Sequence, residues 1–547
     1  MTSFFVRYNL GGKTYETTSP ACDGLKVDVV FDGERLTASI DAEKGVTIDK
    51  FWVDIPYAYN TNKRCFVNGY QSWTDSKEYA VDGHMDTFSR LAEWGVKSVF
   101  MRRTGLGRAG ETFWREYPRK TGVFYGFSYG YVREGDKYDL FASLSEREGY
   151  TIVTFDVSAG IVRIEKDLEG ETFGGRHKVL DAVVLSGSHD EVFDRWFDAM
   201  GVKCSTIGRK SGYTTWYNYY GGVTQAIVER DLKALAEMPQ KVDIFQIDDG
   251  HQACIGEWLN TDRKKFPSGM KAAADKIHEA GMLAGLWLAP FAATRGSFIY
   301  KEHPDWLVKG KDGKPYPAGP NWGVFYPIDF YNKDAAAYIR KFFDVVLREW
   351  GYDLVKLDFL YAACVVPMHG KSRGRIMCEA MDFIRECVGD KLIIGCGVPL
   401  MPAFGKVDFC RIGPDVALNW SYSTHKTRED VGTAKTVLCT IFRRGLDGRA
   451  FFNDPDVFLL RDNNISMSMQ KRKLLAKING LFGSLLFVSD TVSRYTDEQR
   501  AVFADTVRPK DVQVQSADLD GDILTVKYAE DGEAKTLRFD YKTGEEK

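Results

Sequence analysis

The stretch GYDLVKLDFLY (351–361) predicts a buried β-strand that carries two charged side chains. Side chains alternate along a strand, so Leu357 and Phe359 are expected on one face and Lys356 and Asp358 on the other. A buried lysine and aspartate cost free energy unless they are paired or used in chemistry. Two interpretations follow. The pair is either structural, or Asp358 is a catalytic nucleophile that Lys356 keeps ionised.

A regular alternation of predicted strands and helices surrounds this stretch. It begins with a strand at 212–220 and a helix that starts near Thr224. Further strands are expected at 242–250, 283–291, 392–398 and 409–416, at a stretch ending in 451–456, and at 485–489. Strict alternation predicts a parallel sheet, and eight such units predict a (β/α)8 TIM barrel with its catalytic groups at the carboxyl ends of the strands.

Both flanks of the barrel have the two-residue periodicity of antiparallel sheet. Near the start, the alternating runs 25–31 and 36–40 enclose an Asp32-Gly33 turn, and similar runs continue to about residue 202. The tail alternates again from about Pro509. We therefore expect an N-terminal β-sandwich (1–203), a catalytic barrel (204–508) and a small C-terminal antiparallel β domain (509–547).

Composition narrows the class of protein. The net charge is -3 over 547 residues, so the chain has no excess of positive charge to attract nucleic acid, and a nucleic acid partner is not expected. No apolar run approaches the roughly 18 residues of a membrane span, and the N-terminus lacks a signal-peptide pattern. The ten cysteines are scattered, which favours a reduced compartment over a disulfide framework. A cytoplasmic protein is predicted, with self-assembly into a homo-oligomer left open.

The polar residues at the predicted strand ends favour glycoside hydrolysis. That chemistry needs two carboxyl groups across the scissile bond, about 5–5.5 Å apart in retaining enzymes. Asp358 on the fourth strand and Asp415 on the sixth could meet across the barrel mouth. Asp358 would be the nucleophile. Asp415 would be the acid/base, a role that needs part-burial or a nearby carboxylate to favour its protonated form.

Two further motifs have both a functional and a structural interpretation. Asp248 and Asp249 could accept hydrogen bonds from two neighbouring sugar hydroxyls and so select the stereochemistry of the sugar. Alternatively, they could form a turn with a helix N-cap. The loop 66–73 (FVNGYQSW) could bring Trp73 to the active site as a sugar-facing wall, or it could be an aromatic-capped hairpin. Spacing alone favours the hairpin.

Metal binding is the competing use of these aspartates, and they would suit Mg²⁺ or Ca²⁺ better than zinc. Lys356 and Arg411 lie among the acids, and cations at these positions oppose a metal ion. No glycine-rich nucleotide loop follows a strand. We therefore expect neither a metal nor another cofactor.

Taken in order, these motifs resemble glycoside hydrolase family 36, the α-galactosidases, in their short bacterial form. The matching segments are IDDG (247–250), IGEWL (255–259), FPSGM (266–270), GLWLAPF (285–291), KLDF (356–359), GCGVPL (395–400), RIGPD (411–415), NDPD (453–456) and the 68–73 loop. The resemblance covers nearly the whole chain.

The resemblance implies a role for each matched position. Asp358 would be the nucleophile and Asp415 the acid/base. The substrate contacts would be Asp248 and Asp249 to the axial O4 and the O6 of galactose, Lys356 and Arg411 to ring hydroxyls, Trp287 as a stacking surface, Trp73 and Tyr217 as pocket walls, and Cys396 with Gly397 near the 2-position.

The predicted function is therefore a retaining exo-acting α-galactosidase that releases terminal α-D-galactose from an oligosaccharide or glycoside by double displacement. An α-N-acetylgalactosaminidase and an α-galactosyl transglycosylase of the same fold are the alternatives. The first depends on room near Cys396 and Gly397, and the second differs only in acceptor binding. A catalytically inactive carbohydrate-binding protein is disfavoured because both expected catalytic aspartates are present.

Overall fold

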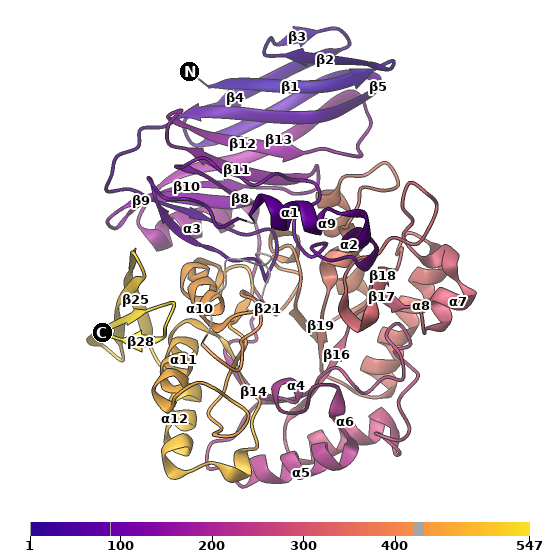
Figure 1. Cartoon of the computed structure of the whole chain (residues 1–547), viewed down its shortest axis with the longest axis vertical. Coiled ribbons are helices and arrows are strands. Elements are labelled where there is room, and N and C mark those ends of the chain that lie inside the picture. Colours follow the sequence, from indigo (N-terminus) through magenta and orange to yellow (C-terminus); the bar gives the residue numbers. More distant parts are fainter. Residues whose placement is uncertain (1, 88, 421–430) are drawn as a thin grey trace.

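A computed structural model describes residues 2–87, 89–420 and 431–547 of the chain. Antiparallel strands from the first third of the chain lie above a ring of strands and helices, and a small C-terminal sheet lies at its side (Figure 1). The predicted fold class, a TIM barrel between two antiparallel β domains, is confirmed. The three domain limits (1–203, 204–508 and 509–547) stay a prediction.

The N-terminal strands form two layers that share one long strand, β5 (Arg35–Pro56). The first half of β5 pairs with β4 (Leu25–Phe31) and β13 (Phe173–Gly187). Its second half pairs with β1 (Ser3–Leu10) and β12 (Ile161–Asp167). The remaining main strands are β6 (Arg64–Val67), β7 (Lys77–Ala80), β8 (Val123–Phe127), β9 (Tyr129–Glu134), β10 (Lys137–Ser143) and β11 (Tyr150–Asp156).

Parallel strands form the barrel, and every registered pair between them is parallel. In chain order the strands are β14 (Lys210–Thr214), β15 (Ile244–Ile247), β16 (Leu283–Leu288), β19 (Leu354–Leu357), β20 (Leu392–Gly395), β21 (Phe409–Arg411), β22 (Phe452–Asp454), β23 (Val457–Phe458) and β24 (Leu485–Val488). They are short and buried on both faces, as expected for a parallel sheet that helices cover.

The seventh barrel strand is split. β22 pairs with β21 and β23 pairs with β24, and only Pro455 and Asp456 separate the two pieces. Because the order of strands runs from β22 round to β23, the ring closes through this interruption. The eight units predicted from the sequence are therefore present, with one strand broken by a proline that has no N–H to donate.

Several predicted strands end earlier in the structure than the sequence suggested. The first strand stops at Thr214, and Tyr217 lies on a short helix, α4 (Trp216–Tyr219), so its placement on a strand was wrong. The fourth strand stops at Leu357, before Asp358 and Phe359. Residues such as Asp358 and Tyr217 therefore lie on the segments that follow the strands, at the carboxyl end of the barrel.

Helices cover the outside of the barrel (Figure 1). They are α5 (Gln225–Ala236), α6 (Gly269–Glu279), α8 (Lys333–Asp344), α9 (Arg373–Val388), α10 (Thr433–Phe442), α11 (Met469–Phe482) and α12 (Asp497–Val507). The sequence did not predict α12 or, in the N-terminal part, α1 (Arg90–Val96), α2 (Val99–Thr104) and α3 (His189–Met200). Among the described residues, no helix has both the length and the apolar character needed to cross a lipid bilayer.

The C-terminal sheet consists of β25 (Val512–Asp520), β26 (Ile523–Glu530), β27 (Glu533–Asp540) and the short β28 (Glu545–Glu546), all antiparallel. It is tied to the N-terminal layers through Arg133, whose guanidinium donates to Ala517 O (3.1 Å) and pairs with Asp518 (2.9 Å). The sheet therefore contacts the sandwich as well as following the barrel in the chain.

Candidate active site

A cavity of about 410 Å³ lies at the carboxyl ends of the barrel strands. Seven of the eleven predicted site residues line it, namely Trp73, Asp248, Asp249, Trp287, Lys356, Asp358 and Asp415. The structure therefore brings together strand ends that are far apart in the chain. This is the edge of a TIM barrel where catalytic groups are expected.

Asp358 is held at the floor of this cavity by two donors. Trp287 Nε1 donates to Asp358 Oδ2 (3.0 Å), and the backbone N–H of Phe359 donates to Oδ1 (2.9 Å). Phe359 has a left-handed backbone (φ 55°), which is uncommon outside glycine and recurs where surrounding structure imposes it at functional sites. This turn also puts the Phe359 ring on the cavity wall, so its predicted place on the outer face of the strand was wrong.

Lys356 pairs with Asp248 and not with its strand neighbour Asp358. Its Nζ donates to Asp248 Oδ2 at 2.9 Å, and both side chains are buried. Burial alone would lower the pKa of Lys356, but the surrounding negative groups, led by Asp248, raise it above its ordinary value. Burial raises the pKa of Asp358 above its ordinary value, and the Lys356 charge acts in the expected direction by lowering it.

The two adjacent aspartates have different partners. Asp248 Oδ2 also accepts from Gln246 Nε2 (2.6 Å), and its Oδ1 accepts from the Asp249 N–H (2.9 Å). Asp249 accepts from Gln252 Nε2 (2.5 Å) and from Trp322 Nε1 (3.0 Å). Burial raises the pKa of Asp249. Both carboxylates face the cavity, so the chain turns at this strand end as the functional interpretation required.

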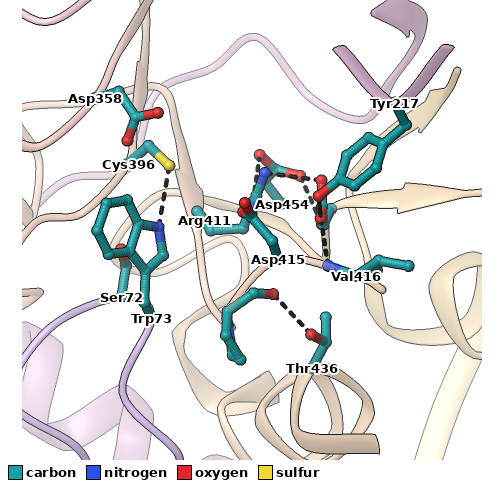
Figure 2. Close-up of polar contacts among 12 residues, drawn as sticks. Ser72, Trp73, Tyr217, Asp358, Cys396, Arg411, Asp415, Val416, Thr436 and Asp454 are labelled. Carbon is teal, nitrogen blue, oxygen red and sulfur yellow. Dashed lines mark hydrogen bonds and ion pairs between the residues drawn. The ribbon is translucent and has the colours of Figure 1, made fainter. Parts of the chain in front are cut away.

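Asp415 lies across the cavity on the segment that follows β21. Its side chain is 39% exposed, and Arg411 Nη1 donates to its Oδ1 at 2.6 Å. Figure 2 shows Asp415 and Arg411 on one side, with Asp358 beside Cys396 on the other. Arg411 also contacts Asp454 (3.6 Å) and Asp456 (2.7 Å), so a cation occupies the centre of this acidic cluster. Lys356 likewise forms an ion pair with a buried carboxylate, that of Asp248.

Four predicted site residues lie behind the cavity wall and do not line it. Arg411 is 3% exposed, and Tyr217 donates its hydroxyl to Asp456. Cys396 accepts from Trp73 Nε1 (3.3 Å), as Figure 2 shows. A Cβ on Gly397 would come within 2.8 Å of the Trp73 ring. The Trp73 indole therefore covers both Cys396 and Gly397.

Trp73 reaches the cavity because its loop is fixed to the barrel. Arg443 on the barrel is fully buried, and its guanidinium donates to Asn68 Oδ1 (2.9 Å) and to the carbonyl of Ser72 (2.8 Å). Ser72 N also donates to Val398 O (2.9 Å). The loop interpretation is thus favoured over an isolated aromatic-capped hairpin, since the sandwich contributes part of the cavity wall.

Sequence reasoning missed several residues that line the cavity. They are Gly105, Leu106, Gly107, Ala109, Trp216, Pro320, Asn321, Trp322, Phe359, Tyr361 and Val431. Trp322 is the most informative, because its indole bonds Asp249 and its backbone is left-handed (φ 53°). It comes from an irregular loop rich in glycine and proline, where periodicity gives no signal. Only its position between Asn321 and Gly323 in a turn-like sequence could have drawn attention to it.

A parallel barrel with carboxylates at its strand ends is an arrangement that glycoside hydrolases use. The Melibiase family model matches residues 217–375. Among curated relatives, α-galactosidase Mel36A of Lactobacillus acidophilus is 35% identical over 99 residues, which is 16% of this chain and 13% of that protein. The A type blood α-D-galactosamine galactosaminidase of Flavonifractor plautii is 33% identical over 134 residues, or 22% of this chain and 12% of that protein.

Solved structures match over much more of the chain. An α-galactosidase of Thermus thermophilus, in complex with p-nitrophenyl α-D-galactopyranoside, has a TM-score of 0.71 and 25% identity. That match covers 98% of this chain and 99% of the other. The α-galactosidase AgaA of Geobacillus stearothermophilus shares the fold at 14% identity, with a TM-score of 0.62 over 94% of this chain and 72% of that one.

The chain therefore resembles the glycoside hydrolase family 36 α-galactosidases, as its motifs predicted. The sequence alignments span 12% to 21% of the length of the curated relatives. The structural match, by contrast, extends over nearly the entire chain.

Proposed function

We propose that the chain is a retaining exo-acting α-galactosidase that releases terminal non-reducing α-D-galactose from α-galactosides by double displacement. The observation that carries the proposal is the placement of Asp358 and Asp415 on one cavity together with Asp248 and Asp249. The similarity to curated α-galactosidases supports it, as does the structural neighbour solved with an aryl α-galactoside. The proposed chemistry uses the side chains of this cavity and no cofactor.

Asp358 is the proposed nucleophile. Hydrogen bonds from Trp287 Nε1 and the Phe359 N–H stabilise its ionised form and aim the carboxylate. Burial opposes this by raising the pKa of Asp358, and the Lys356 charge offsets part of the effect. A desolvated carboxylate is a more reactive nucleophile than a hydrated one, provided that it stays ionised. Attack at the anomeric carbon forms a glycosyl-enzyme ester.

Asp415 is the proposed acid/base. It gives a proton to the leaving oxygen in the first step and takes one from water in the second. Its partial exposure leaves room for both the leaving group and the incoming water. Arg411 Nη1 donates to its Oδ1, which orients the carboxyl group and leaves Oδ2 for the proton transfers.

The other predicted site residues have proposed roles in substrate binding. Asp248 and Asp249 accept hydrogen bonds from the hydroxyls at O4 and O6. Lys356, which is paired with Asp248, donates to a ring hydroxyl. Trp287 stacks on the sugar, and Trp73 closes one side. Arg411, Tyr217, Cys396 and Gly397 act from behind the wall, because they do not line the cavity.

Galactose is favoured over N-acetylgalactosamine by the packing of Trp73. The discriminating region is the wall at Cys396 and Gly397, where an acetamido group would need more space than a hydroxyl. Trp73 covers both residues, with its Nε1 on the Cys396 sulfur and its ring against Gly397. Transglycosylation would use the same groups and differ only in the acceptor. A cytoplasmic location stays a prediction from the sequence.

A panel of aryl α-glycosides tests the proposal directly. We expect turnover of the α-galactoside, and much weaker or no turnover of the α-glucoside and the α-N-acetylgalactosaminide. NMR of the first-formed product should show the α-anomer, since double displacement retains configuration. Preferred cleavage of another glycoside, or release of the β-anomer, would reject the assignment. Product analysis with added acceptor sugars separates hydrolysis from transglycosylation.

A further inference from the structure

Asp456 occupies the break in the seventh barrel strand, between β22 and β23. It is 3% exposed and has a left-handed backbone (φ 69°). Such a conformation is uncommon in residues other than glycine and persists where the surrounding structure imposes it. Asp456 is the last residue of the NDPD segment and has no role in the double displacement proposed above.

The carboxylate of Asp456 is linked to Asp415 by two hydrogen-bonded routes. Its Oδ2 accepts from the backbone N–H of Val416, the residue next to Asp415, at 2.8 Å. Its Oδ1 accepts from Arg411 Nη2 at 2.7 Å, and Arg411 Nη1 donates to Asp415. Tyr217 donates its hydroxyl to the same Oδ2. Asp456 therefore contacts both the backbone at Asp415 and the side-chain partner of Asp415.

We propose that Asp456 is a positioning residue that sets the proton transfer by Asp415, acting through Arg411 and the backbone of Val416. The inference rests on the proposed function, because it gives Asp456 a task in that reaction. Asp456 lies too deep to contact the sugar, since it is absent from the cavity lining.

Charge balance around Arg411 explains how Asp456 acts. One guanidinium faces three carboxylates, those of Asp415, Asp454 and Asp456. The carboxylates of Asp456 and Asp454 therefore compete with Asp415 for the guanidinium of Arg411. Without the Asp456 charge, the guanidinium would act more strongly on Asp415 and favour its carboxylate, and Asp415 would be a weaker general acid.

Four charged or titratable side chains act on the carboxylate of Asp456. They are Arg411, Asp415, Asp454 and Tyr217. Burial raises the pKa of Asp456 to about 7, and Arg411 counters this rise. The charge on Asp456 is thus sensitive to its surroundings near neutral pH, where the proposed enzyme would work.

The test is Asp456→Asn, which keeps the size and one acceptor oxygen but removes the charge. We measure kcat/KM against pH for 2,4-dinitrophenyl α-galactoside, whose leaving group needs little protonation, and for phenyl α-galactoside, which needs more. We expect the phenyl substrate to lose on the order of 10- to 100-fold and the dinitrophenyl substrate less than about 3-fold. The alkaline limb of the phenyl profile should move to lower pH.

Asp447→Asn is the matched control. Asp447 precedes the same split strand at the opposite end of the barrel and accepts from Asn453 N (2.7 Å) and Ser484 Oγ (2.8 Å). Burial raises its pKa as well, to about 6. It has no contact with Arg411 or Asp415, so its variant should keep the wild-type ratio between the two substrates and the wild-type pH profile.

Two results for a folded Asp456→Asn protein would overturn the inference: unchanged kinetics, or an equal loss on both substrates with an unmoved pH profile. If Asp456→Asn does not fold, Tyr217→Phe removes one hydrogen bond from Asp456 and should change the substrate ratio in the same direction. An unchanged ratio there would also overturn it. A wild-type protein that is inactive on every α-galactoside would reject the proposed function itself, which separates the two failures.

Discussion

Lys356 Nζ lies 2.9 Å from Asp248 Oδ2 and joins strands β19 and β15, which β16 separates. The lysine therefore belongs to the pair of carboxylates proposed to read the sugar, while its strand neighbour Asp358 is held by Trp287 and by its own backbone turn. The proposed sugar-binding carboxylate Asp248 and the proposed nucleophile Asp358 thus have different hydrogen-bond partners in one cavity.

Breaking the Lys356–Asp248 pair should cost stability and activity together. Lys356→Met leaves the buried Asp248 without its cation, which should lower the free energy of unfolding by about 3–5 kcal/mol. Adding Asp248→Asn should restore much of that loss but none of the turnover, because both substrate contacts are then gone. Urea unfolding and aryl α-galactoside kinetics measure the two effects. Recovery of activity in the double variant would show that the pair is only structural.

Asp358→Ala should abolish turnover of an aryl α-galactoside while the fold is retained. Loss of a nucleophile typically lowers kcat by on the order of 10⁴-fold or more. Added azide should partly restore reaction by entering the space of the carboxylate, and it should give a β-galactosyl product. Asp353→Asn, at the other end of the same strand, is the control and should keep its activity. Near-wild-type activity of Asp358→Ala would exclude the nucleophile role.

Asp415→Asn should show its effect through the leaving group. Activated aryl galactosides need little proton donation, so their first step should change little. Poor leaving groups should react on the order of 10²- to 10⁴-fold more slowly. Steady-state kinetics across a series of substituted phenyl α-galactosides measures this dependence. A uniform loss over the series would argue against proton donation by Asp415.

Trp322→Phe removes one donor from Asp249 and leaves an aromatic ring in place. The indole Nε1–H bonds Asp249 Oδ2 at 3.0 Å, and a hydrogen bond to a charged group contributes about 1.5–3 kcal/mol. We expect KM to rise by about 10-fold or more, with a smaller change in kcat, because the carboxylate is less well oriented for the sugar. Trp306→Phe, a buried tryptophan outside the cavity lining, is the control. An unchanged KM would show that Asp249 is positioned without Trp322.

Glu146→Gln should remove a pH-dependent loss of stability. Glu146 lies in the sandwich beside a cavity of about 250 Å³ that barrel residues such as Met401 also line. Burial raises its pKa from 4.5 to about 7, so its neutral form is favoured in the folded state. Its stabilising contribution is therefore full below pH 4.5 and is lost as pH rises through about 7, by about 3 kcal/mol.

Urea unfolding at pH 5 and pH 8 checks this difference. From pH 5 to pH 8, the free energy of unfolding should fall more for the wild-type protein than for Glu146→Gln. The exposed Glu302→Gln is the control and should follow the wild type. Equal pH dependence of wild type and Glu146→Gln would contradict the prediction.

Much of the fold could be predicted because its signals are local. Two-residue alternation identified β4 with its Asp32-Gly33 turn, and strand–helix alternation identified the barrel. In a parallel barrel all carboxyl ends of strands meet at one edge, so Asp248, Trp287, Asp358 and Asp415 could be assigned to one cavity before any coordinates were known. The sequence by itself thus determined the class of fold and the charged residues that line the cavity.

Tertiary structure decided which of these residues contact one another. Lys356 pairs with Asp248 because strand register places that carboxylate, 108 positions earlier, within reach of its ammonium group. Trp322 and Asp456 have left-handed backbones in irregular segments, where side-chain periodicity carries no information. Trp73 reaches the cavity because Arg443, which is distant in the chain, fixes its loop. Local patterns report the state of each segment, whereas hydrogen-bond partners depend on how distant segments are brought together.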